Sequence, residues 1–216
     1  MPTSRIRDVG FGPQYPGGQP YYGRMRVIAG TYRSRSLIAP PGTETRPTSD
    51  RLRETLFNIL AARLPGSRFA DLYAGTGAVG IEAISRGAVH VNFAEKAPAA
   101  LVALRSNLKS LKIANGFAIE ERGVGALLER LAKAAQPAAL LDLVYLDPPW
   151  EAEAEYANAL HLLGSARGRQ ILAPGALVIA EHGSKTPLGE GFGELRLTRT
   201  LKQGDAALSF YAATDS

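Results

Sequence analysis

A glycine-rich stretch at residues 69–80 has residue types and spacing suited to a nucleotide cofactor. It reads Phe-Ala-Asp-Leu-Tyr-Ala-Gly-Thr-Gly-Ala-Val-Gly, a short apolar run followed by glycines at 75, 77 and 80. Glycine lets the backbone turn tightly and approach a ligand, and the next helix N-terminus offers unpaired N–H groups. A purely structural turn would share this pattern. The stretch predicts a cofactor turn made of Tyr73, Ala74, Gly75, Thr76 and Gly77.

Two carboxylates beside this turn bear on the identity of the cofactor. The glycines satisfy G-x-G-x-x-G, the dinucleotide fingerprint, and Glu95 follows near the spacing at which an acid holds ribose hydroxyls. Asp71, four residues before the first glycine, would crowd a pyrophosphate but suits a cofactor that carries an ammonium and a sulfonium group. The stretch therefore favours S-adenosylmethionine, and an NAD-dependent oxidoreductase remains the alternative.

A second group of chemically distinctive residues follows an apolar run, in Leu-Val-Tyr-Leu-Asp-Pro-Pro-Trp at residues 143–150. The side chain of Asp147 and the carbonyl of Pro148 can accept the two hydrogens of an exocyclic aromatic amine. They would thereby direct the nitrogen lone pair at a methyl group for in-line displacement. Pro149 stiffens the loop, and Trp150 offers a flat face for a base that has left its own stack. We expect these four residues to be the catalytic loop.

Alternating strand and helix patterns would place both groups at one edge of a parallel sheet. Strands are predicted at 69–72, 89–94, 117–119, 141–146 and 176–180, with apolar helical spacing between them. Ligands bind at the carboxyl ends of such strands. Two further runs, 195–201 and 207–212, predict a closing hairpin. A dinucleotide domain usually continues its parallel winding, whereas a methyltransferase sheet ends with an antiparallel strand inserted beside strand five.

The N-terminal third is strongly basic and contains no lysine. Residues 1–68 carry a net charge of +7, whereas the remainder carries −2. Guanidinium groups suit phosphates and stack on bases, so this third predicts a surface that docks a polyanion, with a solvated basic face as the alternative. The predicted order is a disordered leader at 1–24, a basic hairpin and helix at 25–63 and the main domain at 64–216. The expected RNA-contacting residues are Arg33, Arg35, Arg46, Thr48, Arg51 and Arg53, with Thr48 as helix N-cap.

Composition excludes several functional classes. The chain has 216 residues, 45% of them hydrophobic, and no apolar run approaches the roughly 18 residues of a membrane span. With no cysteine there is neither a disulfide nor a thiolate site, which fits a reducing compartment. The three histidines are far apart, so no metal site is expected. No apolar segment follows the first arginines, so we expect no secretory signal, and we predict a cytoplasmic monomer.

Several of these motifs occur together in one known family. Asp147-Pro-Pro-Trp resembles the [Asn/Asp]-Pro-Pro-[Tyr/Phe/Trp] motif of amino-group methyltransferases. The segments that begin at Arg46, Asp71 and Gly204 resemble the RsmD family of bacterial 16S rRNA guanine-N2 methyltransferases, and the similarity runs over residues 25–211. The resemblance implies a Rossmann-like sheet of seven strands with the last one antiparallel. It also implies S-adenosylmethionine as donor and a guanine of 16S rRNA, within an assembling small subunit, as acceptor.

The resemblance also implies roles for individual residues. Asp71, Gly75 and Gly77 would line the methionine end of the cofactor and Glu95 its ribose. Lys96, next to Glu95, is expected at the same site. After strand three the family usually has an acid or amide followed by alanine at the adenine, whereas Arg122-Gly123 stands here. We therefore expect backbone groups to hold the adenine.

Three alternatives to this interpretation remain at the level of sequence. The acceptor could be the N6 amine of adenine in DNA, because the Asp-Pro-Pro motif recognises an amine more than a particular base. An NAD-dependent oxidoreductase would leave Asp71 and the two prolines without a role. A non-catalytic RNA-binding assembly factor would not need an intact Asp147.

Overall fold

The structure is a computed structural model that describes residues 25–39, 50–134, 136 and 139–213. The predicted leader at 1–24, and Arg46 and Thr48, lie outside the described residues. None of the helices in the described part of the chain has the length and apolar character needed to span a membrane.

Helices and strands alternate along the first two thirds of the chain, as the apolar patterns predict. The helices are α1 (Asp50–Ile59), α2 (Ala78–Ser85), α3 (Pro98–Ser110), α4 (Val124–Lys133), α5 (Glu153–Gly164) and α6 (Ala166–Arg169). The strands are β1 (Arg68–Leu72), β2 (His90–Ala94), β3 (Phe117–Glu120), β4 (Leu141–Leu146), β5 (Leu172–Gly183), β6 (Gly191–Phe192), β7 (Leu195–Gln203) and β8 (Ala206–Ala213).

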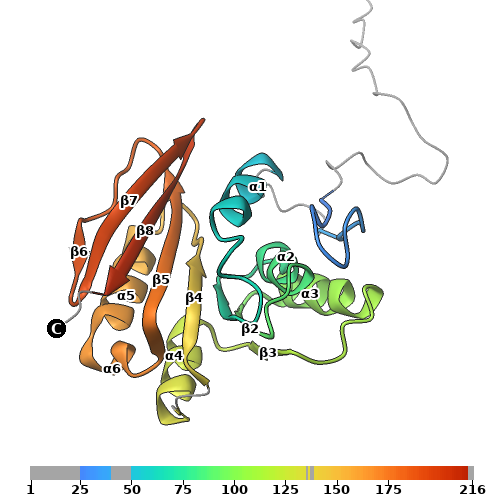
Figure 1. The fold of residues 1–216 in the computed structure, drawn as a ribbon, viewed down its shortest axis with the longest axis horizontal. Coiled ribbons are helices and arrows are strands. Elements are labelled where there is room, and N and C mark those ends of the chain that lie inside the picture. The colour runs from blue at the N-terminus through green and yellow to red at the C-terminus, as the bar shows by residue number, and fades with distance from the viewer. Residues whose placement is uncertain (1–24, 40–49, 135, 137–138, 214–216) are drawn as a thin grey trace, which may run out of the picture.

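The strands form one sheet in the order β3-β2-β1-β4-β5-β8-β7-β6 (Figure 1). The first five of these are parallel, and β8 lies antiparallel to β5. This confirms the Rossmann-like methyltransferase sheet with an antiparallel strand beside strand five. The sheet has eight strands instead of seven, because the two-residue strand β6 pairs with the outer edge of β7.

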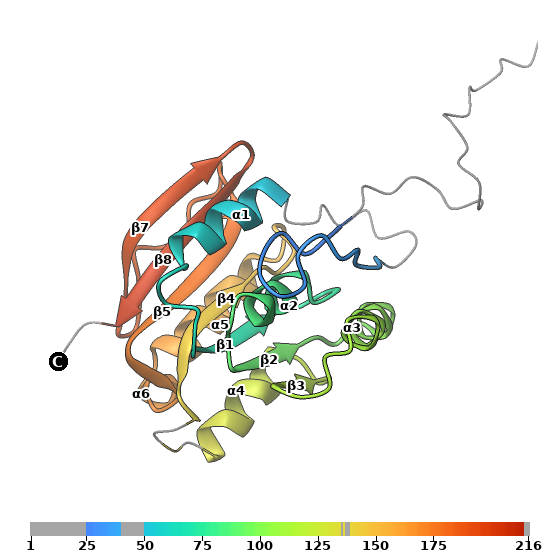
Figure 2. The same cartoon turned by 45° about the vertical axis from the view of Figure 1, so that its right-hand side comes forward.

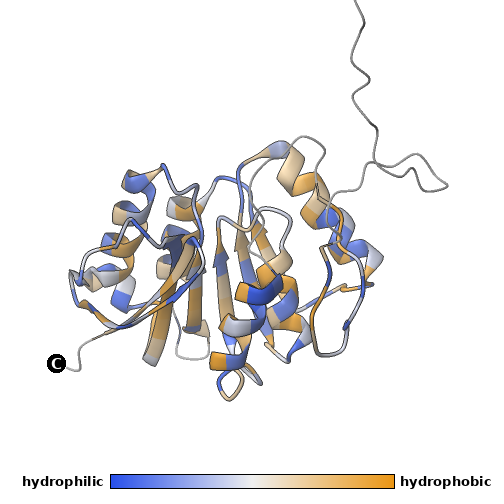
Figure 3. Ribbon diagram, turned by 90° about the horizontal axis from the view of Figure 1, so that it is seen from above, coloured by the Kyte–Doolittle hydropathy of each residue, from blue (hydrophilic) through white to orange (hydrophobic). Residues whose placement is uncertain are grey.

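Two apolar layers cover the two faces of the sheet. One core joins α1, α2 and α3 to one face, and the other joins α4 and α5 to the opposite face (Figure 2). The hydropathy colours in Figure 3 follow this arrangement, with hydrophobic residues along the central strands. The sheet is thus covered on both faces, and its strand ends remain available for a binding site.

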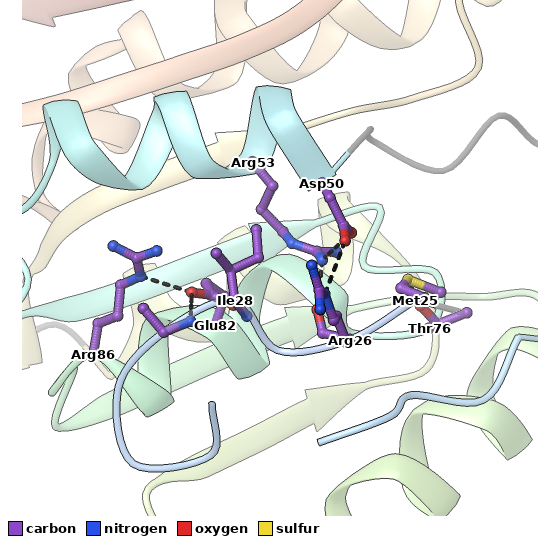
Figure 4. Close-up of polar contacts among 9 residues, drawn as sticks. Met25, Arg26, Ile28, Asp50, Arg53, Thr76, Glu82 and Arg86 are labelled. Carbon is purple, nitrogen blue, oxygen red and sulfur yellow. Dashed lines mark hydrogen bonds and ion pairs between the residues drawn. The ribbon is translucent and has the colours of Figure 1, made fainter. Parts of the chain in front are cut away.

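The N-terminal segment, residues 25–39, packs into the first of these cores and forms the predicted hairpin in a short, irregular form. Arg26 and Ser36 form an antiparallel bridge, and on either side of it the Val27 N–H donates to the Arg35 carbonyl at 2.9 Å and the Leu37 N–H to the Met25 carbonyl at 2.8 Å. The backbone of the hairpin also bonds to α2: the N–H groups of Ile28 and Ala29 donate to the Glu82 carboxylate, at 2.7 and 3.0 Å. Figure 4 shows Glu82 between the segment and Arg86. Side chains of α2 therefore fasten this short hairpin to the main domain.

The fifth strand is longer than predicted. It begins at Leu172, four residues before the predicted start, and its pairing with β4 shifts register between Leu141 and Leu143. Pro174 and Gly175 conceal the strand in the sequence because both residues usually mark turns. The short helix α6 was not predicted, since four residues are too few for a periodic pattern.

Candidate active site

The predicted site residues meet at the carboxyl ends of the parallel strands. Leu72, the last residue of β1, pairs with Ala94 of β2 and with Leu146 of β4. The residues that follow these three strand ends are the cofactor turn (residues 73–77), Glu95 and the catalytic loop (residues 147–150). The strand order reverses between β1 and β4, and ligands of open α/β sheets bind at such a switch point.

The cofactor turn has a backbone that suits close approach of a ligand. Tyr73, Gly75 and Gly77 all have positive φ, at 67°, 55° and 80°. No atom lies within 4 Å of the position that a Cβ of Gly75 would take, so this face of the turn is open. A Cβ at Gly77 would instead lie 2.3 Å from Leu104 Cδ1, because α3 packs closely here. The first glycine thus leaves room for a ligand and the second permits packing.

Three side chains bond to the backbone of the turn or of the first turn of α2 that follows it. Asp71 Oδ2 accepts the Gly80 N–H and Glu95 Oε2 accepts the Gly75 N–H, each at 2.8 Å. Asn107 Nδ2 donates to the Thr76 carbonyl at 3.0 Å. The sequence analysis missed Asn107, because its role depends on packing between residues 31 positions apart.

The buried side chain of Asp71 links the end of β1 to the start of α2. Burial raises the pKa of its carboxyl group to about 7, the Gly80 N–H opposes this shift and nearby Glu95 adds to it. The carboxyl group therefore titrates near neutral pH. The predicted contact of Asp71 with a cofactor ammonium or sulfonium stays a prediction.

Glu95 also holds the two residues that lead into the next helix. Its Oε1 accepts the N–H groups of Lys96 and Ala97, at 2.8 and 2.7 Å, just before α3 begins. With the bond to Gly75, this carboxylate joins the end of β2 to the cofactor turn. Its position matches the predicted ribose site, although the ribose contact itself stays a prediction.

Lys96 and Tyr73 converge on Glu155 of α5. The Tyr73 hydroxyl donates to Glu155 Oε2 at 2.8 Å, and Lys96 Nζ lies 3.5 Å from Oε1. Burial, and next the hydrogen bond to Glu155, raise the pKa of the Tyr73 hydroxyl, which stays protonated. A groove of about 560 Å³ begins here and runs between α4 and α5, lined by Tyr73, Val124, Gly125, Glu155, Asn158, Ala159, His161 and Leu162.

The exposed Arg122 side chain is held by the end of β3. Its Nε and Nη2 donate to Glu120, at 2.8 and 3.2 Å, and the hydrogen bond from Arg122 lowers the pKa of Glu120. Gly123, with φ of 90°, begins the turn into α4, and a Cβ there would lie 3.8 Å from Lys96 Cδ. The backbone after β3 is therefore close to Lys96, as a shared adenine site would require.

The catalytic loop is partly buried at the end of β4. The Asp147 N–H lies 3.4 Å from the Leu72 carbonyl, which continues the pairing of β1 and β4. Asp147 and Trp150 are half-buried, Pro148 is buried and Pro149 is exposed. The Pro148 carbonyl accepts a hydrogen bond from the Tyr156 hydroxyl at 3.1 Å, a contact absent from the sequence analysis. Its second lone pair leaves capacity for one more donor.

The predicted RNA-contacting arginines divide into two groups. Arg33, Arg35 and Arg51 are exposed. Arg53 corrects the prediction, because it is fully buried and its Nη2 donates to the Arg26 carbonyl and to Asp50 (Figure 4). Burial lowers the pKa of its guanidinium. Arg53 thus joins α1 to the N-terminal segment and presents no surface to RNA.

Comparison with known proteins gives consistent matches over most of the chain. The family model described as "Conserved hypothetical protein 95" matches residues 25–212. A Bacillus subtilis protein, "Putative rRNA methyltransferase YlbH", is 34% identical over 187 residues, covering 87% of this chain and 98% of that protein. "Ribosomal RNA small subunit methyltransferase D" of Haemophilus influenzae is 35% identical over 168 residues, covering 77% and 82% of the two chains.

A solved structure extends the similarity to the fold. The Escherichia coli structure "Putative methyltransferase yhhF" has a TM-score of 0.73 and 30% identity, and it covers 88% of this chain and 98% of that one. The sheet order, the two loops at the switch point and these matches lead to one conclusion. The chain belongs to the RsmD family, whose family model it matches over residues 25–212.

Proposed function

We propose that this protein methylates the exocyclic N2 amine of a guanine in 16S rRNA of the small ribosomal subunit, with S-adenosylmethionine as donor. One observation carries this proposal: the open cofactor turn and the amine-accepting loop lie side by side, after two paired strands, in a member of the RsmD family. The names of the relatives, which refer to rRNA methyltransferases, support RNA as acceptor.

The residues at the switch point fit S-adenosylmethionine. The open face over Gly75 would receive the methionine end, with the Asp71 carboxylate below it. Glu95, at the end of β2, would hold the ribose, and the backbone around Gly123 would face the adenine beside the Lys96 stem. The bound cofactor would supply a methyl group on a positively charged sulfur, which leaves as a neutral thioether.

The catalytic loop activates the acceptor. An aromatic amine is a poor nucleophile while its lone pair is delocalised into the ring. Asp147 and the Pro148 carbonyl would accept its two hydrogens, so the lone pair points at the methyl carbon. As the new N–C bond forms, the nitrogen loses one proton to Asp147 or to water. Trp150 would stack on the flipped base, a contribution of about 1–3 kcal/mol.

The exposed arginines of the N-terminal segment and α1 supply the RNA contacts in this proposal. Arg33 and Arg35 lie on a segment whose backbone is fixed to α2 and α3, so their positions relative to the cofactor turn are set by the fold. Phosphate contacts of this type orient RNA without reading its sequence.

The test is transfer of a labelled methyl group from S-adenosylmethionine to small-subunit RNA and to subunits from cells that lack this protein, followed by nucleoside analysis. The expected product is N2-methylguanosine in the small-subunit RNA. The Asp147→Ala variant should not form this product. Label in N6-methyladenine of DNA would replace guanine with adenine as acceptor. NAD binding without S-adenosylmethionine binding would overturn the enzyme class.

A further inference from the structure

The end of β5 lies directly beside the catalytic loop. A Cβ built on Gly183, the last residue of β5, would lie 3.3 Å from Cε3 of Trp150 and 3.7 Å from its Cδ2 and Cζ3. The indole therefore packs against the backbone of Gly183. Because Trp150 is only half-buried, part of its ring system remains accessible while this contact holds it.

A second contact joins the same strand end to the first proline of the loop. The hydroxyl of Tyr156, a buried residue of α5, lies 3.1 Å from the Pro148 carbonyl and 2.9 Å from the Glu181 carbonyl. A phenol has one hydrogen to donate, so these two carbonyls share it. Burial, and next the nearby Asp147 carboxylate, raise the pKa of Tyr156, so the hydroxyl keeps this hydrogen.

We propose that Tyr156 and Gly183 are positioning residues for methyl transfer: Tyr156 orients the Pro148 carbonyl toward the target amine, and Gly183 holds the Trp150 indole in the plane where the base stacks. This inference rests on the proposed function, whose acceptor amine and stacked base it uses. Neither residue touches the reacting atoms, and each acts through a member of the catalytic loop.

The two acceptors of Tyr156 give the loop a specific advantage. When the target amine donates to the second lone pair of the Pro148 carbonyl, the phenol hydrogen can stay shared between this carbonyl and that of Glu181. The carbonyl then gains a second donor while the buried hydroxyl keeps both of its acceptors. Without the hydroxyl, the Pro148 carbonyl loses the hydrogen bond that fixes its direction, and methyl transfer depends on the alignment of the amine.

The role of Gly183 rests on space. Carbon atoms pack best at about 3.5–4.0 Å. The 3.3 Å contact of an added Cβ would therefore shift the indole by a small amount. A valine would displace it further. The φ of Gly183 is not among the positive values, so alanine and valine are compatible with its backbone.

The chain provides its own spectroscopic probe and matched controls. Trp150 is the single tryptophan, so intrinsic tryptophan fluorescence reports on this ring alone. Tyr211 is another buried tyrosine whose hydroxyl donates to a backbone carbonyl, that of Gly189 at 2.9 Å. A Cβ at Gly189 would lie 3.3 Å from the Phe192 ring, which matches the contact at Gly183 but involves the edge strand β6.

The experiment compares Tyr156→Phe with Tyr211→Phe, and Gly183→Ala and Gly183→Val with Gly189→Ala. We expect Tyr156→Phe to lower kcat roughly 10-fold, with KM for RNA and cofactor affinity unchanged. We expect Gly183→Val to raise KM for RNA roughly 10-fold and to reduce RNA-induced quenching of tryptophan fluorescence, with Gly183→Ala intermediate. The two control variants should retain wild-type values in every assay.

A double-mutant cycle separates positioning from general destabilisation. In a Trp150→Ala background, Gly183→Ala should have no further effect on KM. The inference is overturned if Gly183→Ala is equally harmful without the indole, or if Tyr156→Phe behaves as Tyr211→Phe does. The wild-type product in the same assay tests the proposed function separately: methylation of another acceptor would refute that function, while the variants would still test the positioning.

Discussion

The cofactor turn and the catalytic loop lie at the same edge of one sheet, yet they are stabilised in different ways. The cofactor turn is held by three polar side chains, from β1, from the residue after β2 and from α3, which bond to its backbone and to the adjoining α2. The catalytic loop contains two prolines, which fix φ and lack N–H groups, and it is anchored by Tyr156 and Gly183. A glycine turn needs hydrogen bonds from other elements to fix its backbone conformation, whereas a proline loop is already rigid and needs only contacts that fix its position.

This difference predicts that variants of the loop affect catalysis and variants of the turn affect stability. The largest effect is expected for Asp147→Ala, which removes an acceptor for the target amine. Single-turnover methylation should slow by about 10²–10³-fold. Thermal unfolding and S-adenosylmethionine affinity should stay at wild-type values. Asp147→Asn, which keeps a carbonyl acceptor, should recover part of the rate. A Tm that falls together with activity would contradict the prediction that loop variants affect catalysis and not stability.

The pH dependence of stability tests the turn through Asp71. Its pKa is about 7 in the folded protein and 3.8 in the unfolded chain, so the folded state binds more protons between these values. The contribution of Asp71 to the free energy of unfolding should therefore be most favourable below about pH 4 and fall as pH rises to 7, by roughly 2–4 kcal/mol. Urea unfolding at several pH values measures this slope, and Asp71→Asn should flatten it. If the wild type and Asp71→Asn showed the same slope, Asp71 would not be the cause of the pH dependence.

Asn107→Ala tests whether the turn depends on side-chain support. The variant leaves the Thr76 carbonyl and both backbone polar groups of Ile38 without this partner. We expect a loss of about 1–3 kcal/mol in the free energy of unfolding together with weaker cofactor binding, measured by urea unfolding and by calorimetry. Asn58→Ala, at an exposed position of α1, is the control. Unchanged cofactor affinity would show that the turn keeps its shape alone.

The smallest effect is expected for the exposed arginines of the N-terminal segment. Their replacement should change neither the cofactor turn nor the catalytic loop. Replacing both Arg33 and Arg35 with alanine should weaken RNA binding several-fold at physiological salt. It should also reduce the slope of log K against log salt by about 1.4, as for two lost single-strand phosphate contacts. The rate at saturating RNA should not change. Lys133→Ala, on α4, serves as control, and an unaltered slope would locate the RNA elsewhere.

The contrast between turn and loop also explains what could be predicted from the sequence. The strands and both loops follow from local patterns: apolar runs, a glycine cluster and a proline pair. The supporting residues Asn107, Tyr156 and Gly183 carry no local pattern, because their partners lie 8 to 69 residues away or are defined only by packing. Arg53 was misassigned for the same reason, since its buried guanidinium binds the carbonyl of Arg26, which is 27 residues away.

The anchoring of residues 25–39 has a consequence for how the chain matures during translation. The residues that fix this segment, Glu82, Ser85 and Asn107, lie 53 to 69 positions later in the chain. At about 5–20 residues per second, the ribosome delivers them several seconds after the segment itself. Met25, Val27 and Leu37 have no core to enter during that interval. Residues 25–39 are therefore synthesised early but can dock only late. Their arginines remain exposed near the ribosome until the rest of the domain has folded.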